Sequence, residues 1–109
     1  MDWLSEVSYF FGGAFLVNAI PHFVSGVMGR PFQSPFARPP GKGLSSSTVN
    51  ALWGVANFVI AYLLIARVGS FDIRATDNAI AFGVGVLLMA VFSACTFGRF
   101  HGGNKPTGS

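Results

Sequence analysis

Charged side chains are scarce in this chain of 109 residues: Asp, Glu, Lys and Arg make up 10% of it, whereas 51% is hydrophobic. So few charges cannot shield that much apolar surface from water, which excludes an ordinary water-soluble domain. Cysteine is scarce too. The single Cys95 excludes an intramolecular disulfide, and because an apolar site suppresses the thiolate, we expect it to be a small packing residue.

Charge is missing altogether from three long stretches. Uncharged runs cover residues 7–29, 43–66 and 78–98 and are 23, 24 and 21 residues long. At about 1.5 Å of rise per residue, each run reaches roughly 30 Å or more as a helix, which matches the hydrocarbon core of a bilayer. The pattern predicts an all-α integral membrane protein with three transmembrane helices at about residues 9–28, 49–68 and 78–98. Residues 1–109 then form a single membrane domain, with a loop at 29–48 and a polar tail at 99–109.

Basic residues are unevenly distributed over the segments between the runs. The first loop and the tail lie on the same side in a three-span protein, and they hold five basic residues and no acidic one. The other side holds two basic and all four acidic residues. Because Lys and Arg near span ends favour the cytoplasm, we expect an N-out, C-in multi-pass protein of a bacterial-type inner (plasma) membrane. The five are Arg30, Arg38, Lys42, Arg99 and Lys105.

The first loop is rich in proline and phenylalanine. Pro31-Phe32 and Pro35-Phe36 repeat at a spacing of four, and further prolines and glycines exclude a regular helix, so an extended or partly polyproline II segment is predicted. Two interpretations remain open. The rings insert into the headgroup region while the cations face lipid phosphates, or the stiff segment docks along a larger partner at low entropic cost.

Polar side chains within the predicted spans are the strongest functional signal. Asn18 and His22 share a face of the first helix, and Asn50, Trp53 and Asn57 share a face of the second. Ser93 of the third helix lies at a similar depth, so we expect a polar intramembrane cluster. It serves either as hydrogen-bonding glue between helices or as a functional site at which His22 meets a metal, a haem or a quinone-like headgroup.

The distribution of chemistry-bearing residues argues against an enzyme. All four carboxylates fall on the outer side, away from His22, so no catalytic acid, base or triad is available. The other histidine, His101, lies in the tail, and no second buried ligand except Cys95 lies at the depth of His22. We therefore predict no catalytic residue, no metal site and no cofactor within the chain, while a site shared between subunits stays open.

Small residues recur at helical spacing. Gly83, Ala90 and Ala94 lie in a stripe along the third helix, and such stripes let membrane helices approach closely. The stripe serves packing within the chain or a partner outside it. Asp77 is the expected N-cap of this helix. Further small residues at helical spacing are Gly12, Ala19 and Gly26 on the first helix, Gly54 and Ala61 on the second, and Ala79 and Gly98 on the third.

Two classes of function follow. The leading hypothesis is a small, non-catalytic membrane subunit that binds and stabilises a larger membrane protein complex, with the lipid bilayer and larger subunits as partners. The alternative is a homo-oligomer, with further copies of the chain as partners, that forms a transport pathway or a lipophilic-ligand pocket around Asn18, His22 and Asn57. The excess of positive charge suits anionic lipid headgroups, so no nucleic-acid partner is predicted.

Overall fold

The computed structural model describes residues 2–107, and this part of the chain is mostly helical. It contains α1 (Trp3–Val27), β1 (Phe32–Gln33), β2 (Leu44–Ser45), α2 (Ser47–Ala66) and α3 (Thr76–His101) in chain order. All three helices are long and apolar enough to cross a membrane. The prediction of three helices capable of spanning a bilayer is thereby confirmed.

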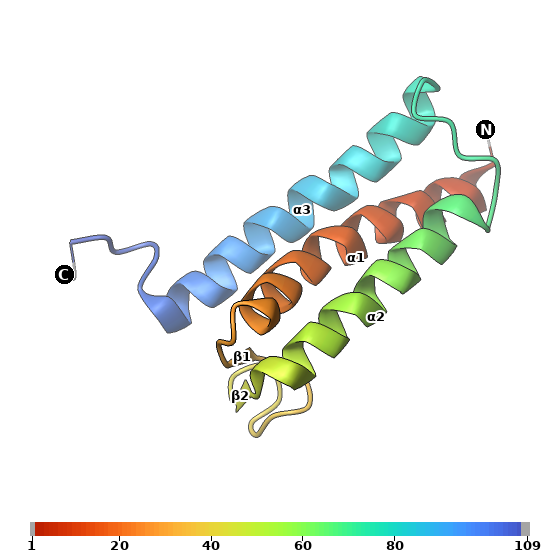
Figure 1. Ribbon diagram of the computed structural model, residues 1–109. Helices are drawn as coiled ribbons and strands as arrows, with labels where there is room; N and C mark the ends of the chain where they lie inside the picture. Colours follow the sequence, from red (N-terminus) through yellow and green to blue (C-terminus); the bar gives the residue numbers. More distant parts are fainter. Residues whose placement is uncertain (1, 108–109) are drawn as a thin grey trace.

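α1 is the central helix. It lies between α2 and α3 and packs against both, and the main packing contacts of α2 and α3 are each with α1 (Figure 1). The molecule measures 45 × 31 × 23 Å along its principal axes. The two short strands lie at the end of the bundle where α1 ends and α2 begins.

The helix ends differ from the predicted boundaries. α1 begins at Trp3 instead of Tyr9 because Asp2 caps it, with Oδ1 accepting from the Leu4 N–H at 3.2 Å. The hydroxyl of Ser46 caps α2 in the same way, accepting from the Val49 N–H at 3.2 Å. α2 accordingly runs over residues 47–66 instead of 49–68.

The expectation that Asp77 caps the third helix is wrong. α3 begins one residue earlier, at Thr76, after an Ala75 that makes no side-chain cap. Asp77 lies in the first turn, where a carboxylate still favours the positive end of the helix dipole. At the other end α3 continues to His101 instead of Gly98, and Gly102 ends it in the left-handed conformation at φ 73°.

The Pro/Phe-rich loop is more ordered than predicted. β1 and β2 pair in antiparallel fashion, with Phe32 opposite Ser45 and Gln33 opposite Leu44. The hydroxyls of Ser34 and Ser45 lie 2.5 Å apart, and the Ser34 carbonyl accepts from the Gly41 N–H at 2.9 Å. The loop is therefore a closed hairpin, and we name residues 32–45 the loop hairpin.

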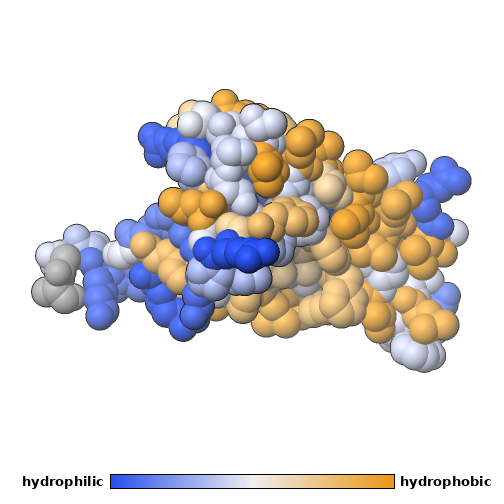
Figure 2. Space-filling view, turned by 90° about the horizontal axis from the view of Figure 1, so that it is seen from below, coloured by the Kyte–Doolittle hydropathy of each residue, from blue (hydrophilic) through white to orange (hydrophobic). Residues whose placement is uncertain are grey.

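Burial is inverted relative to a water-soluble protein. The largest fully buried side chains are those of Tyr9, Asn50, Asn57 and Ser34, whereas Phe92 is 61% exposed. Figure 2 shows an extended hydrophobic surface with hydrophilic patches toward both ends. Water would disfavour this arrangement and a bilayer favours it, so the distribution supports the assignment of the three helices as membrane spans.

Glycines set the distance between the helices. A Cβ on Gly54 of α2 would lie 2.6 Å from the Phe23 backbone nitrogen of α1, and a Cβ on Gly85 of α3 would collide with the Phe10 carbonyl oxygen. The small residues expected on the first two helices face inward, since Gly12, Ala19, Gly54 and Ala61 are buried. On α3 the glycine that faces α1 is Gly85, whereas the predicted stripe through Gly83 lies on another face of the helix.

Candidate functional site

Two hydrogen-bonded side-chain pairs connect α1 to α2 near the loop hairpin. The first joins Asn18 Nδ2 to Asn57 Oδ1 at 3.0 Å, and Asn57 Nδ2 in turn donates to the Trp53 carbonyl at 2.8 Å. The second joins His22 Nδ1 to Asn50 Oδ1 at 2.9 Å. Asn50 and Asn57 are completely buried, and His22 is 3% exposed.

The Asn50 amide ties the loop hairpin to both helices. Its Nδ2 lies 3.0 Å from the Phe32 carbonyl oxygen and 3.2 Å from the carbonyl oxygens of Ser45 and Ser46. Three acceptors around this nitrogen set the orientation of the amide, so its oxygen faces His22. With the amide oxygen on this side, Nδ1 of His22 is the donor of the His22–Asn50 bond.

Aromatic rings surround His22. The ring centroids of Phe32, Phe97 and Trp53 lie 5.5, 6.0 and 6.5 Å from that of His22. Phe32 also stacks on His101 with an interplanar angle of 5°. Phe32, proposed from sequence as a docking residue, thus packs within the chain and joins the loop hairpin to α1 and α3.

Sequence reasoning missed Gln33 and misjudged His101. Gln33 is 6% exposed, and its Oε1 accepts from Nε2 of His101 at 2.9 Å. His101 was expected in a polar tail, but it occupies the last turn of α3. No periodic pattern links two residues 68 positions apart, so only the folded hairpin brings them together.

A pocket of about 220 Å³ opens between α1, the loop hairpin, α2 and α3. Its lining contains side chains with hydrogen-bonding groups and aromatic side chains but no charged side chain. They include Asn18, His22, Gln33, Ser34, Trp53, Phe92, Thr96 and Phe97. We call it the polar pocket.

An apolar pocket of about 410 Å³ adjoins the polar pocket. The two share Asn18 and Phe92 in their linings, and the larger one continues between α1 and α3 toward the middle of the helices. Its walls are otherwise formed by Phe10, Phe11, Ala14, Phe15, Gly85, Leu88 and Met89. We call it the apolar pocket.

Two buried polar atoms of α2 and α3 have no hydrogen-bond partner within residues 2–107. They are Nε1 of Trp53, which belongs to the polar-pocket lining, and Oγ of Ser93. A buried donor without a partner costs about 1–3 kcal/mol. Ser93 does not join the Asn18–Asn57 or His22–Asn50 pair, so the predicted single cluster is divided between the α1–α2 interface and α3.

Ser93 instead lines a shallow groove of about 430 Å³ between α1 and α3. Ala90 and Ala94 form its α3 side, and both are exposed. Gly83, on the same face of α3, is also exposed, and a Cβ there would meet nothing within 4 Å. The α1 side is formed by Val17, Ile20, Pro21 and Val24, and Phe32 and Phe97 complete the lining. We call it the small-residue groove.

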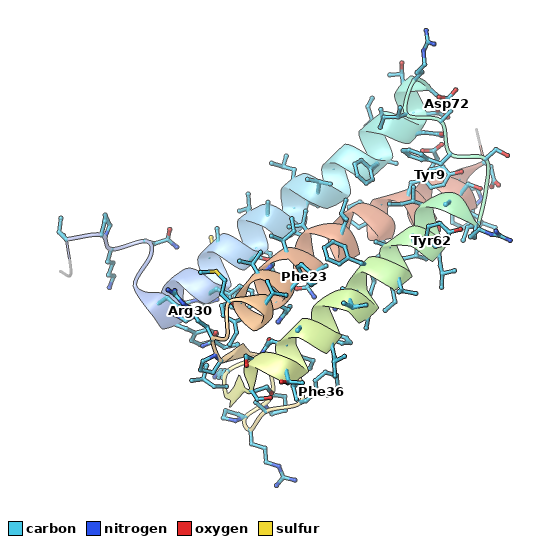
Figure 3. The ribbon with its side chains drawn as sticks, viewed as in Figure 1. Tyr9, Phe23, Arg30, Phe36, Tyr62 and Asp72 are labelled. Atoms are coloured by element: carbon cyan, nitrogen blue, oxygen red, sulfur yellow. The ribbon has the colours of Figure 1, made fainter. Side chains whose placement is uncertain are left out.

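The remaining loop residues singled out from sequence face outward. Pro31, Pro35 and Phe36 are exposed. Phe36 is 63% exposed although its ring packs perpendicular to that of Trp53, with the two centroids 5.1 Å apart. Cys95 is exposed on α3 instead of packed. Figure 3 shows Phe36 and Arg30 at one end of the bundle and Asp72 and Tyr9 at the other.

The acidic residues gather at the end opposite His22. Glu6 Oε1 accepts from Nδ2 of Asn78 at 2.7 Å, which joins α1 to α3. The hydroxyl of Ser5 donates to Asp2 at 2.7 Å and lowers the pKa of that carboxyl below its usual value. Among residues 2–107, no group of three or more His, Cys, Asp or Glu side chains is placed to hold a metal ion.

Comparisons of the chain with protein-family models, with curated proteins and with solved structures find no match. The class of the protein therefore follows from the chain itself. Three helices that are long and apolar enough to cross a bilayer, with an inverted distribution of burial, indicate a membrane protein.

Proposed function

We propose that this protein is a small, non-catalytic subunit of a larger membrane protein complex, which it binds and stabilises. It lies in a bacterial-type inner membrane with the N-terminus outside and the loop hairpin and tail in the cytoplasm. The observation that carries the proposal is the exposed small-residue face of α3, formed by Gly83, Ala90 and Ala94.

This face is not used within the chain. α3 packs on α1 through Gly85, which lies on the opposite side of the helix from Gly83. In a bilayer, exposed leucines and phenylalanines need only lipid around them, whereas a stripe of small residues gives up dispersion contact with lipid unless a helix packs closely on it. The occupant that fits the small-residue groove is a transmembrane helix of a larger protein.

The loop hairpin offers a second contact on the cytoplasmic side. Pro35 and Phe36 of the hairpin and the adjacent Pro31 are exposed, and the hairpin backbone is closed by its own hydrogen bonds, so binding would order little additional chain. Arg38 and Lys42 on the same segment are exposed and suit anionic headgroups or an acidic partner surface.

The test is native mass analysis of the tagged protein after extraction in mild detergent. We expect an assembly much larger than the 11.5 kDa chain that contains other membrane proteins. In the double variant Ala90→Leu/Ala94→Leu, the added side chains fill the small-residue groove, and the partner should be lost. The matched control is Cys95→Leu, an equally exposed position on α3 outside this groove.

Two outcomes would contradict the proposal. One is a mass that is a multiple of 11.5 kDa alone, which would indicate the homo-oligomer. The other is retention of the partner by the double variant at wild-type level. The thermal unfolding temperature of both variants should equal that of the wild type, because the replaced side chains are exposed.

A further inference from the structure

We propose that the polar and apolar pockets together form a binding site for one lipid molecule, whose headgroup is a compact, uncharged ring bearing carbonyl or hydroxyl oxygens. The headgroup occupies the polar pocket and its single apolar chain occupies the apolar pocket. This is the chemistry of an isoprenoid quinone or quinol. The site lies within one copy of the chain and does not depend on the proposed partner.

The shape of the combined cavity matches such a molecule. The two pockets are about 220 and 410 Å³, which lies in the size range of ligand sites, and they share Asn18 and Phe92. The polar pocket lies at the loop-hairpin end, and the apolar pocket extends along α1 from Asn18 to Phe10, about 12 Å at helical rise. A polar head near the membrane surface and a tail toward its middle follow the polarity of the bilayer itself.

The lining of the polar pocket selects the headgroup. It contains no charged side chain, so a phosphate or an ammonium group would be desolvated without compensation. The hydroxyl of Thr96 and the amide of Gln33 are available to bond ligand oxygens. The rings of Phe92, Phe97 and Trp53 favour a flat group that can stack between them.

Trp53 supplies an independent observation. Its Nε1–H is buried and has no partner within the described part of the chain, and Trp53 is one of the residues that line the same pocket. Buried indole N–H groups are normally satisfied, and a ligand carbonyl that reached this donor after a small ring rotation would satisfy it. The small-residue groove, by contrast, is shallow and lies on the other side of the α1–α3 contact, so it is not part of this site.

Trp53 also provides the measurement. The chain has two tryptophans, and Trp3 is 66% exposed, so the variant Trp3→Phe leaves Trp53 as the reporter at the site. Decylbenzoquinone, titrated into this protein in detergent, should quench the Trp53 fluorescence with a saturable dependence, because quinones quench indoles on contact. Decylbenzene, which has the chain without the oxygens, should not compete.

Thr96→Val removes one hydrogen-bonding group at nearly constant shape and should weaken the apparent affinity about five- to tenfold. Thr48→Val is the matched control, because Thr48 is exposed in the first turn of α2, and it should bind as the parent does. Unaltered circular dichroism and unfolding temperature would show that both variants keep the fold.

Three results would overturn the inference. Quenching that rises linearly without saturation would show partition into detergent only. Saturable quenching that Thr96→Val leaves unchanged would place the quinone elsewhere. Monodecanoylglycerol is the third probe. If it relieved the quenching with an apparent affinity higher than that of the quinone, the pocket would prefer a flexible glycerol headgroup to a ring.

Discussion

Nδ1 of His22 lies 2.9 Å from Oδ1 of Asn50, and this contact joins the loop-hairpin end of α1 to the first turn of α2. Asn50 also holds three backbone carbonyls through its other amide atom. One side chain thereby connects two helices and both strands of the loop hairpin. The arrangement predicts that the hairpin and the helix pair lose order together.

Replacing Asn50 by Leu should release the loop hairpin. The substitution removes the side-chain donor shared by the three carbonyls and the acceptor of the His22 ring, while the backbone N–H of residue 50 still bonds the Ser46 carbonyl. We expect a loss of about 1–3 kcal/mol in the free energy of unfolding in mixed detergent. Limited trypsin digestion reports the hairpin directly. Arg30 and Arg38 are each followed by proline, which blocks cleavage, so Lys42 is the site to follow.

The matched control for this substitution is Asn104→Leu, because Asn104 is exposed and its amide makes only a long contact of 3.4 Å to the Ala94 carbonyl. Cleavage at Lys42 should accelerate in the Asn50 variant and remain at the wild-type rate in the control. Equal cleavage rates in both variants would show that the amide does not anchor the hairpin.

Gly85→Ala and Gly83→Ala should have opposite consequences although the two residues are close in sequence. A Cβ on Gly85 would collide with the Phe10 carbonyl, whereas a Cβ on Gly83 would meet open space. We expect Gly85→Ala to destabilise the protein by about 1–3 kcal/mol through forced separation of α1 and α3. Gly83→Ala should be neutral or slightly stabilising, since alanine favours helix. Equal unfolding free energies for the two variants would contradict the packing of α3 described above.

Cysteine labelling tests the orientation. In a Cys95→Ala background, Leu44→Cys and Ser70→Cys each introduce one exposed thiol in a loop and leave the charge unchanged. In intact spheroplasts, which expose the periplasmic face, a membrane-impermeant maleimide should label position 70 and leave position 44 unlabelled until the membrane is opened. Labelling of position 44 in intact spheroplasts would reverse the proposed topology.

Sequence reasoning was most successful where a single physical requirement dominates. The absence of charge over more than 20 residues indicates a span regardless of what the helix touches, so the three helices were predictable. The spacing of Asn18 and His22 places them on one face, and in the structure both side chains bond to α2. Local periodicity sufficed for these features.

Features that depend on which neighbour a helix face meets were not predictable. Helical spacing marks the stripe through Gly83 as small, but it does not reveal that α1 lies against Gly85. The bond between Gln33 and His101 needs the hairpin to fold back and α3 to extend beyond its predicted end. Proline content argued against a helix in the loop, and it left open the pairing of β1 with β2.

The central position of α1 also implies an order of assembly. Three side-chain hydrogen bonds cross from α1 to α2: Ser8 to the Leu64 carbonyl, Asn18 to Asn57, and His22 to Asn50. All of them, and the pairing of β1 with β2, involve only residues that precede α3. The α1–α2 pair can therefore form its hydrogen bonds without α3, and α3 can then pack last on the free side of α1.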